Sequence, residues 1–114
     1  MDNVTLAKGI IEKILYITIA SVTPDGKPWN SPVYSAYDEK YNFYWISWTK
    51  NQHSKNINHN PNVFLSIYDS TVPEGTGEGV YVQGTAYELT DGTEIEFADE
   101  QLTNLFRKKR KKSN

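Results

Sequence analysis

Residues 16–37 read YITIASVTPDGKPWNSPVYSAY and carry the pattern of a β-hairpin. Tyr16–Val22 is rich in β-branched and aromatic residues, which favour strands. In Thr23–Pro28 a proline presets one turn position, and Asp-Gly supplies the positive φ of a hairpin turn. Trp29–Tyr37 is therefore the expected partner strand. Because Pro32 cannot donate to a ladder, we expect this strand at a sheet edge, at a bulge or facing a ligand.

The rest of the chain predicts a small β-barrel with helices around it. In chain order, the further expected elements are a helix over Asn3–Leu15, a strand over Tyr41–Trp48, a short helix ending at Asn60, strands over Asn62–Tyr68 and Val80–Leu89, and a helix over Thr93–Lys109. The Asn62–Tyr68 run is nearly all apolar, as in a central strand. The Gly-rich Ser70–Gly79 stretch lacks a Walker lysine and GxGxxG spacing, so it is expected to be a plain hairpin loop. Consecutive hairpin-linked strands of this number are typical of small barrels.

Composition limits the possible classes of protein. A chain of 114 residues is expected to form one domain, which we place at residues 1–106, followed by a basic tail at 107–114. The net charge of −2 gives no general attraction to nucleic acid or anionic membranes. The absence of cysteine excludes disulfides and thiolate metal sites. With neither a basic-then-apolar leader nor an apolar run long enough to span a bilayer, we expect a soluble, cytoplasmic protein.

The tail contains six consecutive basic residues at positions 107–112. One interpretation is a solvated helix end, since cations suit the negative end of the helix dipole. The other is a polybasic patch that contacts nucleic acid or acidic lipid. We favour the solvated tail, because the remainder of the chain is acidic.

Residues 42–61 read NFYWISWTKNQHSKNINHNP and indicate an anion site. An aromatic strand leads into a polar turn and a helix start, where backbone N–H groups favour negative charge. A phosphate needs several donors and compensating positive charge. The candidate donors are the hydroxyls of Ser47, Thr49 and Ser54, and the candidate cations are Lys50 and Lys55. His53 is interpreted either as a phosphate contact or as a cap or packed group, and His59 is badly spaced for a shared metal, so no metal site is expected.

Three local patterns resemble the FMN-binding split-barrel family related to pyridoxamine 5'-phosphate oxidase. They are the Asp-Gly hairpin followed by Ser31-Pro32-Val33, the aromatic strand ending at Ser47 with Asn56-Ile57 and Asn60-Pro61 beyond it, and the late Val82–Ala86 strand. The resemblance covers roughly Ile14 to Leu89. It implies a mainly β fold, a small antiparallel split β-barrel of Greek-key type, with N-terminal, inter-strand and C-terminal helices.

The resemblance also implies a homodimer with FMN at the subunit interface. The FMN phosphate would sit against the turn after the third strand and the helix that follows, with the ring along the second and third strands. By position, the implied cofactor-binding residues are Ser31, Pro32 and Val33 beside the ring and Ser47, His53, Ser54 and Lys55 around the phosphate turn. The types of the neighbouring residues add Thr49 as a donor, Lys50 as a cation and Trp48 as an aromatic neighbour of the cofactor. No catalytic residue is identified, because Ser-His-Asp, paired-carboxylate and nucleophile-elbow patterns are absent.

The expected function is therefore that of an FMN-dependent oxidoreductase acting on a small molecule. The family's Ser-Arg-Lys triplet reads Asn51-Gln52-His53 here, and the basic residues that would bind pyridoxamine phosphate are not recognisable. The sequence leaves the substrate and the electron donor open. The alternatives are a non-catalytic module that holds FMN, a deazaflavin or haem, and a nucleic-acid-binding protein that uses the barrel and tail.

Overall fold

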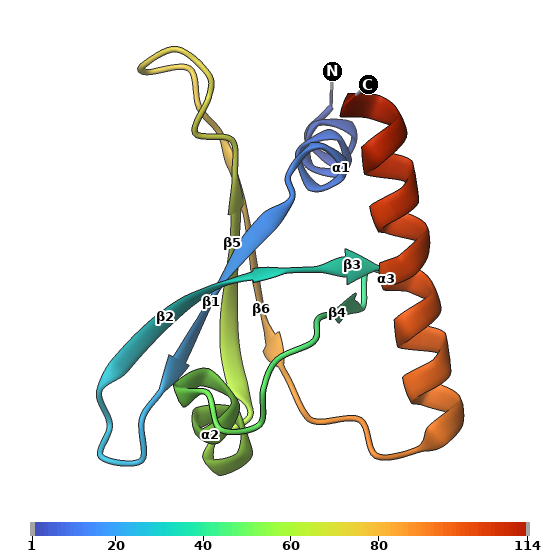
Figure 1. Cartoon of the computed structure of the whole chain (residues 1–114). Coiled ribbons are helices and arrows are strands. Elements are labelled where there is room, and N and C mark those ends of the chain that lie inside the picture. The colour runs from blue at the N-terminus through green and yellow to red at the C-terminus, as the bar shows by residue number, and fades with distance from the viewer. Residues whose placement is uncertain (1, 114) are drawn as a thin grey trace.

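The computed structural model describes the backbone of residues 2–113 and the side chains of residues 2–105 (Figure 1). In chain order the elements are α1 (Asn3–Lys13), β1 (Tyr16–Val22), β2 (Pro28–Tyr34), β3 (Ala36–Tyr37), β4 (Phe43–Tyr44), α2 (Gln52–His59), β5 (Asn62–Tyr68), β6 (Gly79–Thr85) and α3 (Gly92–Ser113). The order of helices and strands is the predicted one. None of the helices in the described part of the chain combines the length and apolarity that crossing a bilayer requires.

Four strands form an antiparallel sheet in the order β2-β1-β5-β6, and β3 and β4 form a separate antiparallel pair. The β1–β2 hairpin pairs Tyr16 with Tyr34 at one end and Val22 with Pro28 at the other. Its turn needs Gly26, which has a φ of +86° and donates its N–H to the Thr23 carbonyl at 2.9 Å. Because β2 is an edge strand, Pro32 removes no hydrogen bond from the sheet interior.

Three predicted strands are shorter in the structure. The Val80–Leu89 prediction is wrong beyond Thr85, where β6 ends, because Thr85 pairs with Asn62, the first residue of β5. The Trp29–Tyr37 strand breaks at Ser35, whose hydroxyl donates to the carbonyl of Tyr44 at 3.2 Å. The Tyr41–Trp48 prediction is wrong beyond Tyr44, where β4 ends. Its partner β3 is only two residues long, so residues 45–48 have no neighbouring strand to pair with. The alternation of half-buried and exposed side chains continues there and imitates a strand.

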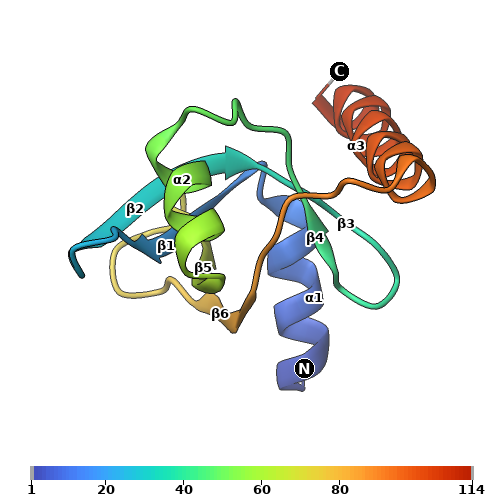
Figure 2. The same ribbon diagram turned by 90° about the horizontal axis from the view of Figure 1, so that it is seen from below.

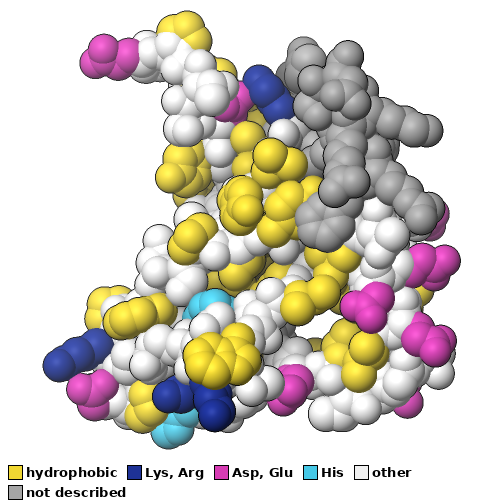
Figure 3. Space-filling model, viewed as in Figure 1, with side chains coloured by type: hydrophobic (Ala, Val, Ile, Leu, Met, Phe, Trp, Pro, Cys, Tyr) yellow, Lys and Arg dark blue, Asp and Glu magenta, His cyan; other side chains and the backbone are white. Residues whose placement is uncertain are grey.

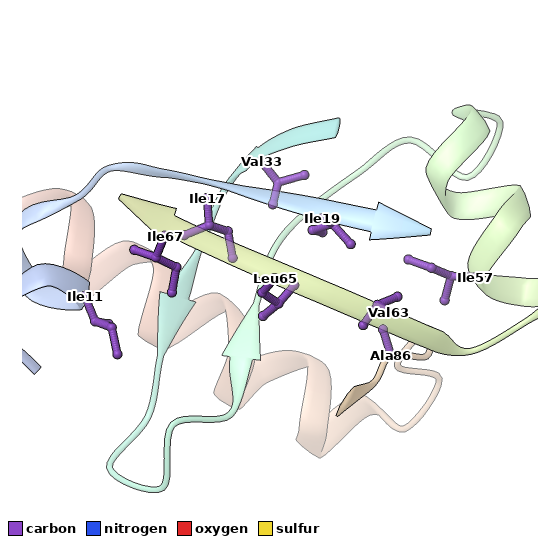
Figure 4. Close-up of a cluster of buried hydrophobic side chains, with 9 residues drawn as sticks. All are labelled: Ile11, Ile17, Ile19, Val33, Ile57, Val63, Leu65, Ile67 and Ala86. Atoms are coloured by element: carbon purple, nitrogen blue, oxygen red, sulfur yellow. The ribbon is translucent and has the colours of Figure 1, made fainter. Parts of the chain in front are cut away.

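The core lies on one face of the four-stranded sheet, between the sheet, α1 and α2. Figure 4 shows its nine members, which are Ile11, Ile17, Ile19, Val33, Ile57, Val63, Leu65, Ile67 and Ala86. Burying each large aliphatic side chain stabilises the fold by about 1.5–3 kcal/mol. β5 is an interior strand, as predicted, but Phe64 and Tyr68 on its other face are exposed. The apolar residues of β5 therefore lie on both faces of the sheet, and only one of these faces contributes to the core.

α3 packs against β3 and β4 and stands to one side of the four-stranded sheet (Figure 2). Ala98 and Leu102 are its buried apolar contacts, and the ring of Phe97 meets that of Tyr44 edge-on at 5.9 Å. The α3 backbone continues to Ser113 and so includes the basic run, whose side chains lie outside the described residues. The division into a domain and a tail at residue 106 stays a prediction.

Candidate functional site

A cavity of about 940 Å³ lies between α3 and the face of the barrel. Its walls come from β4 and the segment after it, from β5 and β6, from the connection at residues 86–89 and from the first turns of α3. Figure 3 shows an opening between the lower part of α3 and the body of the molecule. Large apolar side chains line much of the cavity, among them Phe43, Trp45, Leu65, Val82 and Phe97. A cavity with apolar walls and a few polar groups is the usual form of a small-molecule site.

One end of the cavity carries hydroxyls and the start of α2. Ser47, Thr49 and Ser54 line it, together with Asn58. The N-cap residue of α2, Asn51, makes no side-chain hydrogen bond to the first turn. The first N–H groups of a helix have no partner within the helix, so this end keeps backbone donors for a ligand. Of the first turn of α2, Ser54 lines the cavity, so its hydroxyl and N–H join the hydroxyls of Ser47 and Thr49 as donors that suit an anion.

His53 lies behind this end of the cavity and is not part of its lining. Its side chain is buried, and its Nε2 lies 2.7 Å from Ser47 Oγ. Burial lowers the pKa of His53 below its ordinary value of 6.5. The imidazole is therefore neutral at pH 7 and adds no positive charge to the site.

α2 is held against the sheet by a buried amide. The side chain of Asn56 is fully buried, and its Nδ2 donates to Ser21 Oγ on β1 at 3.1 Å. Its Oδ1 accepts a hydrogen bond from Gln52 Nε2 at 2.7 Å. These bonds fix the orientation of α2 and hence the direction in which its first turn points.

Lys50 and Lys55 are exposed, and neither lines the cavity. Lys50 Nζ lies 5.8 Å from the ring centroid of Trp48, within the range of a cation–π contact. Trp48 is itself exposed and does not line the cavity. The two lysines flank the start of α2 in the sequence, so they contribute positive charge near the hydroxyl end.

The β2 residues predicted beside a flavin ring lie away from this cavity. Ser31 is buried and accepts a hydrogen bond from Trp29 Nε1 at 3.2 Å. Val33 belongs to the core, and Pro32 points to the exposed face of the sheet. The structure thus brings together Ser47, Thr49 and Ser54 in the cavity, while the remaining candidates surround it or lie elsewhere. The cofactor contacts assigned to all of these residues stay predictions.

The cavity lining also includes residues that the sequence did not single out. Glu88 and Glu94 are the charged side chains among its described lining residues, and Tyr87 and Thr93 lie beside them in the chain. They come from the β6–α3 connection and the start of α3, far from residues 47–54 in sequence. The Val82–Ala86 motif of the sequence analysis ends just before this segment. It is the nearest sequence pattern that could have indicated these site residues.

Comparison with known proteins gives a family match and several similar folds. The sequence profile of the family described as pyridoxamine 5'-phosphate oxidase matches residues 6–113. No curated protein matches the sequence. Among solved structures, a conserved hypothetical protein from Mycobacterium tuberculosis has a TM-score of 0.77 at 19% identity, covering 93% of this chain and 64% of its own.

Two further structures have functional names. A haem-binding protein from Mycobacterium smegmatis has a TM-score of 0.73 at 23% identity, covering 83% of this chain and 39% of its own. A protein named F420 reductase has a TM-score of 0.63 at 25% identity, covering 84% of this chain and 75% of its own. The chain thus spans less than two thirds of the length of the first two structures. The likeness confirms the predicted fold class, a split β-barrel with three flanking helices.

Proposed function

The chain belongs to the pyridoxamine 5'-phosphate oxidase family, and we propose that it binds FMN and transfers electrons from a reduced donor to a small acceptor. The observation that carries this proposal is the cavity of about 940 Å³, which joins apolar walls to an end rich in hydroxyls at the uncapped start of α2. FMN has the matching parts, a flat ring system and a phosphate. The family relation alone does not select the ligand, because one fold hosts many functions.

The charges of the cavity lining favour one orientation of FMN. The phosphate dianion fits the end formed by Ser47, Thr49 and Ser54, where hydroxyl and backbone N–H groups donate. Glu88 and Glu94, elsewhere in the lining, would repel it. Lys50 and Lys55 add partial neutralisation from the solvent side.

The apolar walls would hold the ring and keep water from it. Phe43 and Trp45 are aromatic members of these walls, and Val82 faces them from β6. When bound, FMN would supply the redox chemistry, whereas the residues of the chain bind it, orient it and set its surroundings. The cofactor is proposed to lie at a homodimer interface, so that a partner subunit covers exposed apolar residues at the rim of the cavity.

Haem, which one structural neighbour binds according to its name, fits the cavity less well. Haem iron needs an axial ligand such as His, Cys, Met or Tyr. The described lining contains no His, Cys or Met. The lining contains three tyrosines, Tyr41, Tyr44 and Tyr87. Tyr44 donates its hydroxyl to Asp38 at 2.9 Å, and burial followed by this contact raises its pKa to about 12, so Tyr41 and Tyr87 are the remaining candidates for an axial ligand. A deazaflavin would use the same apolar walls as FMN and is the second candidate, on the likeness to the F420 reductase.

Titration of the purified protein with FMN and with riboflavin, followed by flavin fluorescence, tests the proposal. We expect micromolar or tighter binding of FMN and weaker binding of riboflavin, which lacks the phosphate. Replacing both lysines, Lys50→Ala with Lys55→Ala, should weaken FMN several-fold and leave riboflavin unchanged, because exposed charges contribute roughly 1 kcal/mol or less each. The matched control is Lys8→Ala with Lys27→Ala, two exposed lysines of α1 and the first turn.

Each failure in this titration has a distinct meaning. A protein that gives no signal with micromolar FMN contradicts the flavin proposal itself. Equal loss of FMN and riboflavin in the lysine variant contradicts the placement of the phosphate. Anaerobic mixing of the FMN complex with NADH and NADPH then separates an oxidoreductase from a carrier, because bleaching of the flavin absorbance shows that the complex accepts electrons.

A further inference from the structure

We infer that His53 is a positioning residue, which makes the hydroxyl of Ser47 a hydrogen-bond donor toward an anion in the cavity. The inference rests on the proposed function, in which that anion is the FMN phosphate. Its geometric basis is the 2.7 Å separation between His53 Nε2 and Ser47 Oγ, with Ser47 in the cavity lining and His53 buried behind it. His53 thus acts on a ligand through Ser47.

The burial of His53 separates this role from that of a basic phosphate ligand. Burial is the cause that lowers its pKa, and no charged side chain contributes to the shift. At pH 7 the ring is neutral, so it offers a hydrogen bond and no net charge. Positive charge near the phosphate then comes from Lys50 and Lys55, and His53 orients the hydroxyl of Ser47.

The donor role follows from the chemistry of the two groups. A neutral imidazole carries one N–H, on either Nδ1 or Nε2. With the proton on Nε2, His53 donates to Ser47 Oγ, and the Ser47 hydroxyl proton is free to point into the cavity. With the proton on Nδ1, Ser47 donates to His53 and presents only lone pairs to a ligand. A phosphate dianion only accepts hydrogen bonds, so its contact with the Ser47 hydroxyl requires the first arrangement.

Four variants test this relay. His53→Gln keeps an amide N–H near the position of Nε2, His53→Leu removes the donor, and Ser47→Ala removes the hydroxyl. His59→Leu is the matched control, because His59 is exposed on the same helix and does not line the cavity. We expect Ser47→Ala to weaken FMN binding about tenfold or more, as the loss of a hydrogen bond to a charged group does. We expect His53→Leu to weaken it about fivefold, because Ser47 keeps its hydroxyl but loses the partner that orients it.

Riboflavin serves as the internal control for the fold of each variant. The affinity for riboflavin should stay within about twofold in all four variants, since riboflavin has no phosphate to accept a hydrogen bond from Ser47. His53→Gln should retain FMN affinity within about threefold, because its amide can still donate to Ser47. The inference is overturned if His53→Leu and His53→Gln bind FMN equally well, or if they lose FMN and riboflavin in parallel.

A second measurement does not need FMN. The imidazole resonances of His53 and His59 are followed by NMR in the ligand-free protein and in its Ser47→Ala variant while inorganic phosphate is added. We expect phosphate to shift the Nε2 resonance of His53 in the wild type but not in Ser47→Ala. If the wild type binds no FMN, the proposed function fails, and this phosphate response alone decides the inference. An unchanged His53 resonance, or the same shift in both proteins, overturns it.

Discussion

Asn56 places the start of α2 through a closed network of buried polar groups. Its amide bonds to Ser21 Oγ on β1 and to Gln52 Nε2 one turn back on α2. Ser21 is buried as well and has little access to water, whereas Gln52 is half-buried. A buried polar group left without a partner costs more than an average hydrogen bond contributes. The orientation of the cavity's hydroxyl end therefore depends on this amide.

Replacing Asn56 by alanine should lower the free energy of unfolding by about 1–3 kcal/mol, because Ser21 and Gln52 lose their partner. Urea denaturation followed by circular dichroism measures the change. Asn58→Ala is the control, since Asn58 is exposed on the same helix and should change stability by less than about 0.5 kcal/mol. Equal losses in the two variants would contradict the role given to the buried amide.

At the scale of single residues, the sequence identified the polar segment but not the role of each side chain. Ser47, Thr49 and Ser54 lie within eight residues of each other, and local spacing was enough to predict that they share one end of a site. The interpretation of His53 was left open between ligand and packed group. Its burial and its bond to Ser47 depend on how α2 packs on the sheet, and no local pattern encodes that.

At the scale of elements, α1 is tied to the end of β5 by an ion pair. Lys13 Nζ in α1 lies 2.6 Å from Asp69 Oδ2, and Asp69 Oδ1 accepts a hydrogen bond from the Thr71 N–H at 2.9 Å. The hydrogen bond with Lys13, followed by those with Thr71, lowers the pKa of Asp69 well below its ordinary value of 3.8. α1 also contributes Ile11 to the core, so this contact holds the helix that closes one side of it.

The sign of the Asp69 effect gives a pH-dependent prediction. Because its pKa is lowered in the folded state, Asp69 stabilises the fold fully above its unfolded pKa, near pH 4, and progressively less as the pH falls toward the folded value. Asp69→Asn should be less stable than the wild type at pH 7, and the difference should shrink at pH 3. Urea denaturation at both pH values measures it. Glu74→Gln, in the exposed β5–β6 loop, should show no such pH dependence in its difference from the wild type.

The elements also show which structure the sequence can predict. β1 and β5 have the bounds that their composition predicts, because each is long, apolar on one face and bordered by a turn. The strand predicted to reach Trp48 stops at Tyr44, since a strand needs a partner and the pattern of one segment does not report whether a partner exists. The contact of α3 with β3 and β4 likewise depends on tertiary packing, which the sequence of α3 alone does not predict.

At the scale of the whole molecule, exposed apolar side chains surround the cavity. Ile46 is 74% exposed, Trp48 66% and Tyr87 73%. Ile46 and Tyr87 line the cavity, so these surfaces lie beside the proposed cofactor. Neighbouring exposed apolar groups at a site rim are typical of a surface that a partner covers. This supports the proposed homodimer and suggests the face on which it forms.

Sedimentation equilibrium should therefore give twice the chain mass of 13.1 kDa. Ile46→Asp should shift the equilibrium toward the monomer, because it places a charge in an apolar interface. Tyr68→Ser, on the exposed face of β5 away from the core, should leave the dimer intact. A monomeric wild type, or a dimer disrupted by Tyr68→Ser and not by Ile46→Asp, would contradict this interface.

The cavity could not be predicted at this scale from sequence alone. Its walls come from segments between Tyr41 and Ala98, and α3 contributes a wall while it packs against β3 and β4. The sequence predicted that the hydroxyl groups of residues 47–54 share one site, because they belong to one continuous segment. The acidic residues of the lining required the position of α3 relative to β6, which depends on packing across the whole fold.

The position of α3 affects which amino-acid substitutions can alter the cavity. None of the nine core residues comes from α3, yet Thr93, Glu94, Ile95 and Phe97 line the cavity. Substitutions on that one helix face can alter the shape and charge of the cavity while the packing that maintains the barrel is left intact. The cavity wall contributed by α3 can therefore vary separately from the core, whereas the wall that includes Ile57, Val63, Leu65 and Ala86 belongs to both the cavity and the core.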